Sequence, residues 1–355
     1  MRIVVTGASG NVGSAVLRRL VADGGHDLVG VSRRRPAAEP PFDSVAWRTV
    51  DLTDDAATGK LVGVLDGADA VVHLAWGFQP SHDLRWLEEL GVGGTRRVLA
   101  AVASAGVPHL VHMSSVGAYS PRRSDTPVDE SWPTDGVPSS PYSRHKAAAE
   151  RLLDAHQATY PERVVTRLRP GIIGQRAAGS ALLRYGLPGF VPGSVLGHVP
   201  VLPLDRRLRI PMVHADDVAA AVAAALAGAV PGPFNLAAEP PVTSPDIAEA
   251  LGARLVHVPS PVLRTGMSLA WHARLQQVDP GWLDLGFAVP LLETSRARSE
   301  LGWAPQVDGL TVLAEMLSGM RDSAAAASPV LRPRSVLSQL GRAVREGPVS
   351  SRRRP

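Results

Sequence analysis

The N-terminal residues combine a short apolar run with a glycine-rich turn. Ile3–Val5 is continuously apolar, and Gly7, Gly10 and Gly13 follow it at intervals of three residues. Apolar positions then recur at helical spacing as far as Val21. The pattern therefore predicts a buried strand, a tight glycine turn and a helix, in that order.

Apolar runs and helical patterns go on alternating through the N-terminal half. Four further strands are predicted, at Asp27–Val31, Ala46–Val50, Ala70–Leu74 and His109–Met113. Helical segments such as Thr95–Ala105 lie between them. This alternation favours an α/β fold, a Rossmann-type doubly wound parallel sheet with helices on both faces. Ligands of such sheets bind at the carboxyl ends of the strands.

The second half of the chain is less regular. Residues 1–175 are expected to form the Rossmann domain, completed by a return of the chain over about 210–238. A smaller substrate-binding part is expected from residues 176–209 and 239–322, followed by a disordered basic tail over 323–355.

Positive charge is concentrated at the C-terminal end. Residues 328–355 carry seven Arg and one Glu, whereas the whole chain has a net charge of only +4. We therefore expect a solvated tail and no specific nucleic-acid site; an electrostatic tether to nucleic acid or anionic lipid is the alternative.

Composition excludes several classes of function. The chain has no cysteine, which excludes disulfides, thiolate catalysis and Cys-bound metal. The apolar run Val218–Val230 is too short to span a bilayer and predicts a buried helix. His214, Asp216 and Asp217 before it are interpreted as the helix start, capped by Asp, and not as a metal site. No secretory signal is apparent, so a cytoplasmic location is expected.

Tyr142 and Lys146 are the strongest indication of catalysis. Lys146 is one of only two lysines in an arginine-rich chain, and it follows Tyr142 by four residues. On a helix the two side chains share a face. An ammonium beside a phenol lowers the phenol's pKa and suits it to general acid/base work. An exposed surface pair is the alternative interpretation.

The turn at Gly7–Gly13 is expected to bind the pyrophosphate of a dinucleotide at the helix N-terminus. The second strand ends at Ser32 and is followed by Arg33 and two further arginines. An acidic residue at this place would hold a ribose 2′-hydroxyl, whereas Arg accommodates a 2′-phosphate. We therefore predict NADP in preference to NAD, the alternative being a solvated loop.

Nine short motifs follow one another along about residues 1–320. They are Thr6-Gly7-x-x-Gly10-x-x-Gly13, Asp51-Leu52, His73-Leu74-Ala75, Ser114-Ser115-Val116-Gly117-Ala118-Tyr119, Tyr142-x-x-x-Lys146, Arg169-Pro170-Gly171, His214-Ala215-Asp216-Asp217-Val218, Phe234-Asn235-Leu236 and Leu301-Gly302-Trp303-x-Pro305. In type and order they resemble the extended short-chain dehydrogenases/reductases of the NAD-dependent epimerase/dehydratase type.

This resemblance implies an enzyme that moves hydride between NAD(P) and a carbonyl or secondary alcohol. Ser115 would hydrogen-bond the substrate oxygen, Tyr142 would be the acid/base, and Lys146 would bind the nicotinamide ribose and lower the pKa of Tyr142. The implied cofactor contacts are Gly7, Gly10, Asn11, Val12 and Gly13 at the pyrophosphate, Asp51 and Leu52 at adenine, Leu74, Ala75 and Trp76 beside the nicotinamide, and Pro170 and Ile172 over the carboxamide.

Three departures from the family pattern weaken the case for a nucleotide-diphosphate sugar as substrate. Gly91 stands where such members carry Asn, Tyr119-Ser120 replaces the common Tyr-Gly that follows the active-site Ser115, and Ile210 replaces an Arg. Val116-Gly117 lacks the acidic pair of dehydratases, so a dehydratase ranks last, while a net reductase and an epimerase stay open.

The aromatic residues between 262 and 287 are interpreted as core, or as a lid over a fairly apolar substrate. The assembly is compatible with a homodimer. The alternative function is a non-catalytic NADP-sensing or scaffold protein of the same fold.

Overall fold

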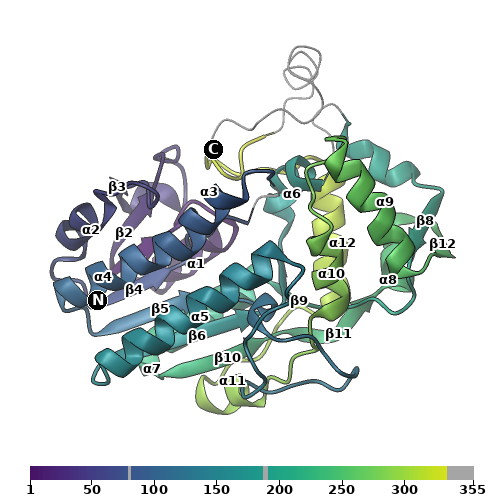
Figure 1. Cartoon of the computed structure of the whole chain (residues 1–355). Helices are drawn as coiled ribbons and strands as arrows, with labels where there is room; N and C mark the ends of the chain where they lie inside the picture. Colours follow the sequence, from purple (N-terminus) through teal and green to yellow (C-terminus); the bar gives the residue numbers. More distant parts are fainter. Residues whose placement is uncertain (79–80, 187–190, 334–355) are drawn as a thin grey trace.

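The computed structural model describes residues 1–78, 81–186 and 191–333. At its centre lies a seven-stranded parallel sheet in the order β10-β6-β5-β4-β1-β2-β3 (Figure 1). Its strands are β1 (Arg2–Thr6), β2 (Asp27–Ser32), β3 (Ala46–Thr49), β4 (Ala70–His73), β5 (His109–Met113), β6 (Val164–Pro170) and β10 (Gly232–Leu236). The Rossmann-type fold is confirmed, and the five predicted strands are present within one residue of their predicted ends.

Helices cover both faces of this sheet. On one face lie α1 (Asn11–Asp23) and α7 (Ala215–Gly228), and on the other lie α2 (Ala57–Leu65), α4 (Gly94–Ala105) and α5 (Pro141–Thr159). Side chains alternate along a strand, so Ile3 and Val5 pack towards α1 while Val4 packs towards α2 and α4. Burial of each such side chain stabilises the fold by roughly 1.5–3 kcal/mol.

Strand β1 lies between β2 and β4, and the chain crosses from one side of β1 to the other after β3. At the carboxyl end of β1, Thr6 pairs with Val31 on one side and His73 on the other. This is the topological switch point, where open parallel sheets bind their ligands.

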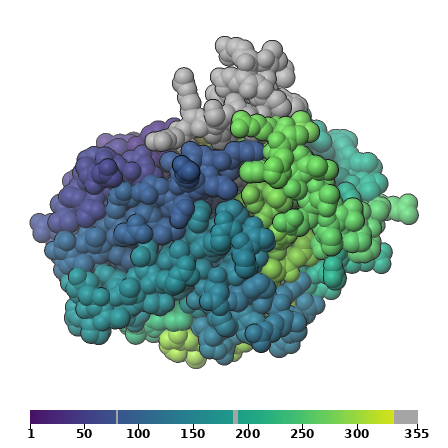
Figure 2. Space-filling model, in the orientation of Figure 1, coloured from purple at the N-terminus to yellow at the C-terminus, as the bar shows by residue number. Residues whose placement is uncertain are grey.

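Most of the remaining elements form a second part beside the carboxyl ends of the strands, on the right in Figure 1. It holds two small sheets, β11-β9-β7 and β12-β8. In Figure 2 its surface lies directly against that of the N-terminal half. Its elements are β7 (Ile172–Gly174), β8 (Val201–Leu204), β9 (Arg209–His214), β11 (Ala238–Thr243), β12 (Arg254–His257), α6 (Gly179–Gly186), α8 (Ser244–Leu251), α9 (Ser260–His272), α10 (Gly281–Ala288) and α12 (Gly309–Arg321). Helix α3 (Leu84–Glu88) precedes α4, and α11 (Ser295–Glu300) packs beside β10 of the main sheet.

The start of α7 differs from the expected aspartate cap. His214 is the N-cap residue, and its Nδ1 accepts from the Asp216 backbone N–H at 3.2 Å. Asp217 lies in the first turn and accepts from the backbone N–H groups of Gln306 and Val307. A carboxylate that is occupied by a neighbouring loop cannot serve as the cap.

The first part of the expected disordered tail is folded. Residues 324–333 pack on the folded protein, and Ser328 and Leu331 are buried. The expectation of disorder from residue 323 is therefore wrong for this stretch, because Leu331 supplies apolar surface that composition alone had discounted. Residues 334–355, which hold six of the seven arginines of the expected tail, lie outside the described residues. Within the described ranges, every helix is too short or too polar to cross a bilayer.

Candidate active site

The glycine-rich turn follows β1 and leads into α1. Gly7 has a φ of +69°, and a Cβ there would lie 2.6 Å from the Ala75 backbone nitrogen. A Cβ on Gly13 would lie 2.3 Å from the Gly7 carbonyl oxygen. Both positions therefore require glycine, because the turn passes against β4 and folds onto itself.

The N-terminus of α1 offers a free anion site. Its N-cap is Gly10, which has no side chain to cap the first N–H groups, and the first turn holds no acidic residue. These donors and the helix dipole fit the pyrophosphate of a dinucleotide. Asn11 and Val12 open the helix, and the Asn11 amide donates to the Ile173 carbonyl, which ties the turn to β7.

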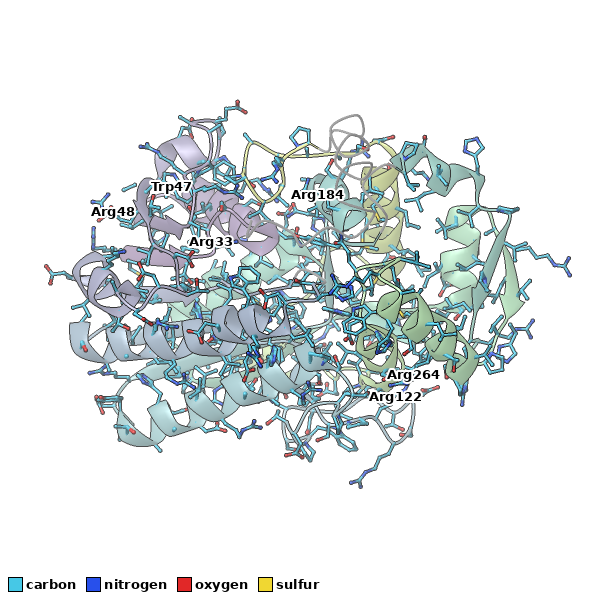
Figure 3. All side chains as sticks on the ribbon, turned by 45° about the horizontal axis from the view of Figure 1, so that its top comes forward. Arg33, Trp47, Arg48, Arg122, Arg184 and Arg264 are labelled. Atoms are coloured by element: carbon cyan, nitrogen blue, oxygen red, sulfur yellow. The ribbon has the colours of Figure 1, made fainter. Side chains whose placement is uncertain are left out.

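The predicted adenosine contacts lie together beyond β2 and β3. Arg33 follows β2 (Figure 3), and its guanidinium lies 5.5 Å from the Trp86 ring centroid. Burial lowers the pKa of Arg33, while the nearby Asp51 carboxylate opposes that shift. Asp51 accepts hydrogen bonds from the Thr53 backbone and hydroxyl, and Leu52 beside it is buried. The Arg33 guanidinium, the Asp51 carboxylate and the apolar Leu52 side chain together suit contact with the adenosine part of a dinucleotide.

Ser115 and Tyr142 meet at the carboxyl end of β5. Ser115 accepts from the Gly117 N–H at 3.0 Å. Helix α5 is capped by Ser140 and starts at Pro141, which brings Tyr142 into its first turn. A Cβ on Gly117 would lie 2.8 Å from Tyr142 Cε1 and 3.4 Å from Ser115 Oγ. The absence of a side chain at Gly117 thus lets the serine and the phenol approach each other.

Lys146 lies one turn after Tyr142, but its ammonium is directed elsewhere. It donates to the Met113 carbonyl at 2.9 Å and lies 3.6 Å from the Trp76 ring centroid. Burial lowers the pKa of Lys146 to about 7, although Glu150 opposes the shift. Burial also raises the pKa of Tyr142 to about 12, offset only in part by Ser115. The expected lowering of the tyrosine pKa by Lys146 is therefore wrong for this arrangement.

A buried ionic cluster supports these residues from behind. Glu150, one turn beyond Lys146, accepts from Arg169 Nε at 2.9 Å and from the Ser114 hydroxyl at 2.5 Å. The arginines hold the pKa of Glu150 at about 2 despite its burial, so it stays ionised. Arg169 also donates to the Tyr119 hydroxyl. Glu150 was missed from the sequence; its only signal is the i,i+4 spacing from Lys146.

The residues predicted beside the nicotinamide lie around the same opening. Leu74 and Ala75 follow β4 against the glycine turn, and Trp76 lies between Lys146 and Tyr142. Pro170 ends β6, and Ile172 begins β7 with 42% of its surface exposed.

Aromatic side chains surround the Tyr142 ring. Trp282 of α10 lies 4.8 Å away, Phe78 5.8 Å and Trp76 6.4 Å, measured between ring centroids. Tyr185 of α6 contacts Phe78 from the other side at 6.1 Å. Phe78 was missed from the sequence, while Trp282 was noted there only as core or lid.

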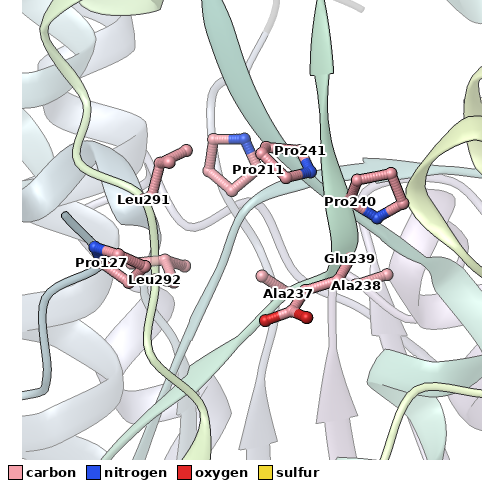
Figure 4. A pocket seen from close by; sticks show the side chains of 9 residues that line it. All are labelled: Pro127, Pro211, Ala237, Ala238, Glu239, Pro240, Pro241, Leu291 and Leu292. Atoms are coloured by element: carbon pink, nitrogen blue, oxygen red, sulfur yellow. The ribbon is translucent and has the colours of Figure 1, made fainter. Parts of the chain in front are cut away.

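The structure also has a second hollow. It has a volume of about 410 Å³ and is lined mainly by Pro127, Pro211, Pro240, Pro241, Leu291 and Leu292 (Figure 4). None of the predicted site residues lines it.

The fold and the site together define a Rossmann-type, dinucleotide-binding protein of the extended short-chain dehydrogenase/reductase class. Residues 3–237 match the NAD dependent epimerase/dehydratase family, and the chain belongs to that family.

Several curated proteins are similar to this chain over part of their own length. An uncharacterized protein of Mycobacterium tuberculosis is 29% identical over 308 residues, which is 86% of this chain and 28% of that protein. The 2′-dehydrokanamycin reductase of Streptomyces kanamyceticus is 31% identical over 64% of this chain and 58% of its own. The chain thus spans less than two thirds of the length of these relatives.

Solved structures share the fold. The UDP-glucose 4-epimerase of Thermus thermophilus, in complex with NAD, has a TM-score of 0.66 at 22% identity, covering 90% of this chain and 99% of that one. DesIV, a dTDP-glucose 4,6-dehydratase from Streptomyces venezuelae with NAD and TYD bound, has a TM-score of 0.67 at 24% identity, covering 91% and 97%.

Proposed function

We propose that the protein is an NAD(P)-dependent oxidoreductase that moves hydride between the nicotinamide and a carbonyl or secondary alcohol. The observation that carries this proposal is the meeting of Ser115 and Tyr142 beside an uncapped glycine-rich helix start. The family match supports it, because related proteins include a reductase and an epimerase by name.

In this proposal the bound nicotinamide supplies or accepts the hydride. Tyr142 donates its phenolic proton to the carbonyl oxygen as that oxygen becomes a hydroxyl, and takes the proton back in the reverse direction. The Ser115 hydroxyl donates a hydrogen bond to the same oxygen and stabilises the charge that develops there. A tyrosine pKa of about 12 keeps the phenol protonated at neutral pH, which favours its use as a proton donor in reduction. Lys146 would hold the nicotinamide ribose.

The aromatic surroundings of Tyr142 suggest an apolar carbonyl substrate. A Cβ on Gly91 would lie 3.0 Å from the Trp76 ring, so Trp76 fills the space where relatives that act on nucleotide sugars carry Asn. Ile210 is packed in the apolar cluster around Met212 and does not supply a cation for a diphosphate. Together, Trp76, Phe78 and Trp282 would enclose the apolar body of a substrate.

We also propose NADP as the preferred dinucleotide. Arg33 and Arg34 follow β2 at the place where an acidic residue would select NAD. The relatives solved with a cofactor are named with NAD, so the preference rests on these two arginines.

Tyr142→Phe tests the proposed chemistry. The variant keeps the ring but removes the proton, so turnover of an aromatic ketone with NADPH should fall roughly 10²–10⁴-fold. The binding constant for NADPH should change less than about twofold, since the hydroxyl contributes little to dinucleotide binding.

Tyr160→Phe is the matched control, because Tyr160 ends α5 and packs on His156 and Arg163, away from the site. Unchanged turnover in Tyr142→Phe would remove this residue from the mechanism. Absence of turnover in the unmodified protein across aromatic, aliphatic and nucleotide-sugar carbonyls would favour the non-catalytic NADP-sensing alternative.

A further inference from the structure

The segment that follows α12 returns to the glycine-rich turn at the other end of the chain. The Ser328 hydroxyl is buried and donates to the Ser9 carbonyl at 2.8 Å, and it accepts from the Leu331 N–H at 3.0 Å. The Ala37 N–H, in the loop after β2, donates to the Ala327 carbonyl at 3.2 Å. In Figure 1 this segment is the yellow stretch that runs from α12 towards the purple strands.

The same segment is held on its other side by α6. Leu331 is fully buried against Ala178 and Ala181. The Arg184 guanidinium donates to the carbonyl oxygens of Val330 and Arg332. Residues 327–332 therefore bridge the phosphate-binding turn, the loop after β2 and the second part of the molecule. Figure 3 shows their ribbon between Arg33 and Arg184 in that view.

The hydrogen bond between Ala37 and Ala327 joins the segment that carries Arg332 to the loop that carries Arg34. Burial lowers the pKa of Arg34, and the positive charge of Arg332 lowers it further. In the part of the chain that the structure describes, the Arg34 guanidinium has no hydrogen-bond or ion-pair partner, and that of Arg332 donates only to the Pro329 carbonyl. Two neighbouring guanidinium groups without a carboxylate are the natural partners of a phosphate group.

The neighbouring glycine-rich turn and the loop after β2 indicate which phosphate group these two arginines would bind. In a Rossmann sheet the residues after the second strand surround the adenosine ribose, and an Arg there accommodates a 2′-phosphate. Ser328 fixes the C-terminal segment on the turn, and Ala327 fixes it on this loop. The first anchor therefore lies at the pyrophosphate-binding turn and the second at the loop beside the adenosine ribose, and neither lies at Tyr142.

We propose that residues 327–332 form the outer wall of the adenosine end of the cofactor site, and that Arg332 binds the ribose 2′-phosphate together with Arg34. The selection of NADP over NAD is then made in part by a residue from the far end of the chain. This inference rests on the proposed dinucleotide site and is independent of the chemistry at Tyr142.

The test is Arg332→Ala in the full-length protein. Dissociation constants for NADP and for NAD are measured by calorimetry, in the absence of carbonyl substrate. Loss of a charged hydrogen-bonding partner should weaken NADP binding roughly 10-fold or more. Binding of NAD, which lacks the phosphate, should change less than about twofold by the same argument. Arg254→Ala, which removes an exposed arginine from β12, is the matched control and should leave both constants unchanged.

Ser328→Ala is a second test, because it removes the hydrogen bond that fixes the segment on Ser9 and keeps the positive charge of Arg332. It should weaken NADP binding more than NAD binding, by a smaller factor than Arg332→Ala. Unchanged NADP binding in Arg332→Ala, equal weakening for both dinucleotides, or no dinucleotide binding by the unmodified protein would each overturn the inference. Selective loss in a protein that shows no turnover would sustain it while contradicting the proposed catalytic function.

Discussion

Lys146 occupies a position that is costly for a lysine. Its ammonium lies over the Trp76 ring and donates to the Met113 carbonyl, and almost none of its surface reaches solvent. Desolvation outweighs the attraction of Glu150, so its pKa falls to about 7. At neutral pH this side chain is poised between its two protonation states. Its charge therefore responds to whatever binds beside it.

This position makes the stability of the protein depend on pH. The pKa is about 7 in the folded chain and 10.5 in the unfolded chain, so between these values the unfolded chain binds more protons. The free energy of unfolding should therefore rise with pH across this window, by at most about 1.4 kcal/mol per pH unit from this residue. Urea unfolding of the unmodified protein and of Lys146→Met, from pH 7 to 10, should show the difference. Parallel pH profiles for the two proteins would contradict the assignment.

The roles of single residues were only partly predictable. The spacing of Tyr142 and Lys146 predicts a shared helix face, since that follows from local geometry. The direction of the Lys146 ammonium depends on Trp76 and on Met113, which lie on other elements. No local pattern contains that information. The expected effect of Lys146 on the phenol failed for this reason.

Among the elements, α5 and β6 are joined by a buried ionic cluster. Glu150 on α5 is 1% exposed and contacts Arg167 at 3.1 Å and Arg169 at 2.9 Å, both on β6. This contact fixes the helix that carries Tyr142 against the sheet. A buried carboxylate with two arginines is strongly coupled, because each charge compensates the desolvation of the others.

Removal of one partner should therefore destabilise the protein. Glu150→Gln leaves the buried Arg169 without a countercharge and leaves Arg167 with only the exposed Asp154, so the free energy of unfolding should fall by about 3–5 kcal/mol. Asp154→Asn is the matched control, because Asp154 also contacts Arg167 but is 63% exposed, and it should cost less than about 1 kcal/mol. Denaturant unfolding at pH 7 measures both. Equal losses would show that the cluster does not join these elements.

The inner strands β1, β4 and β5 of the main sheet were predictable because they are buried on both faces and are therefore largely apolar in sequence. His109–Met113 was predicted residue for residue. The elements of the second part were not, because β8 and β12 alternate between exposed and half-buried residues and owe their pairing to each other. Helix α9 has no buried residue to mark one face as core.

At the scale of the whole molecule, the site is assembled from distant parts of the chain. The glycine turn at Gly7, the phenol at Tyr142, the ring of Trp282 and the C-terminal Ser328 belong to four separate segments. The glycine motif of the turn predicts phosphate binding from the sequence, because such a tight turn requires glycine. The C-terminal segment carries no such motif, and its composition resembles that of a disordered tail. Its place is shown by contacts with residues far away in the sequence, such as the hydrogen bond from Ser328 to Ser9.

The most direct test of the account follows the hydride itself. The protein is incubated with an aromatic ketone and NADPH that carries deuterium at the transferable position of nicotinamide C4, and the alcohol is examined by mass spectrometry. We predict one deuterium in the product with the unmodified protein, and incorporation at least about a hundredfold slower with Tyr142→Phe. Retention of the label in the dinucleotide, or equal transfer by both proteins, would contradict the proposed role of this site.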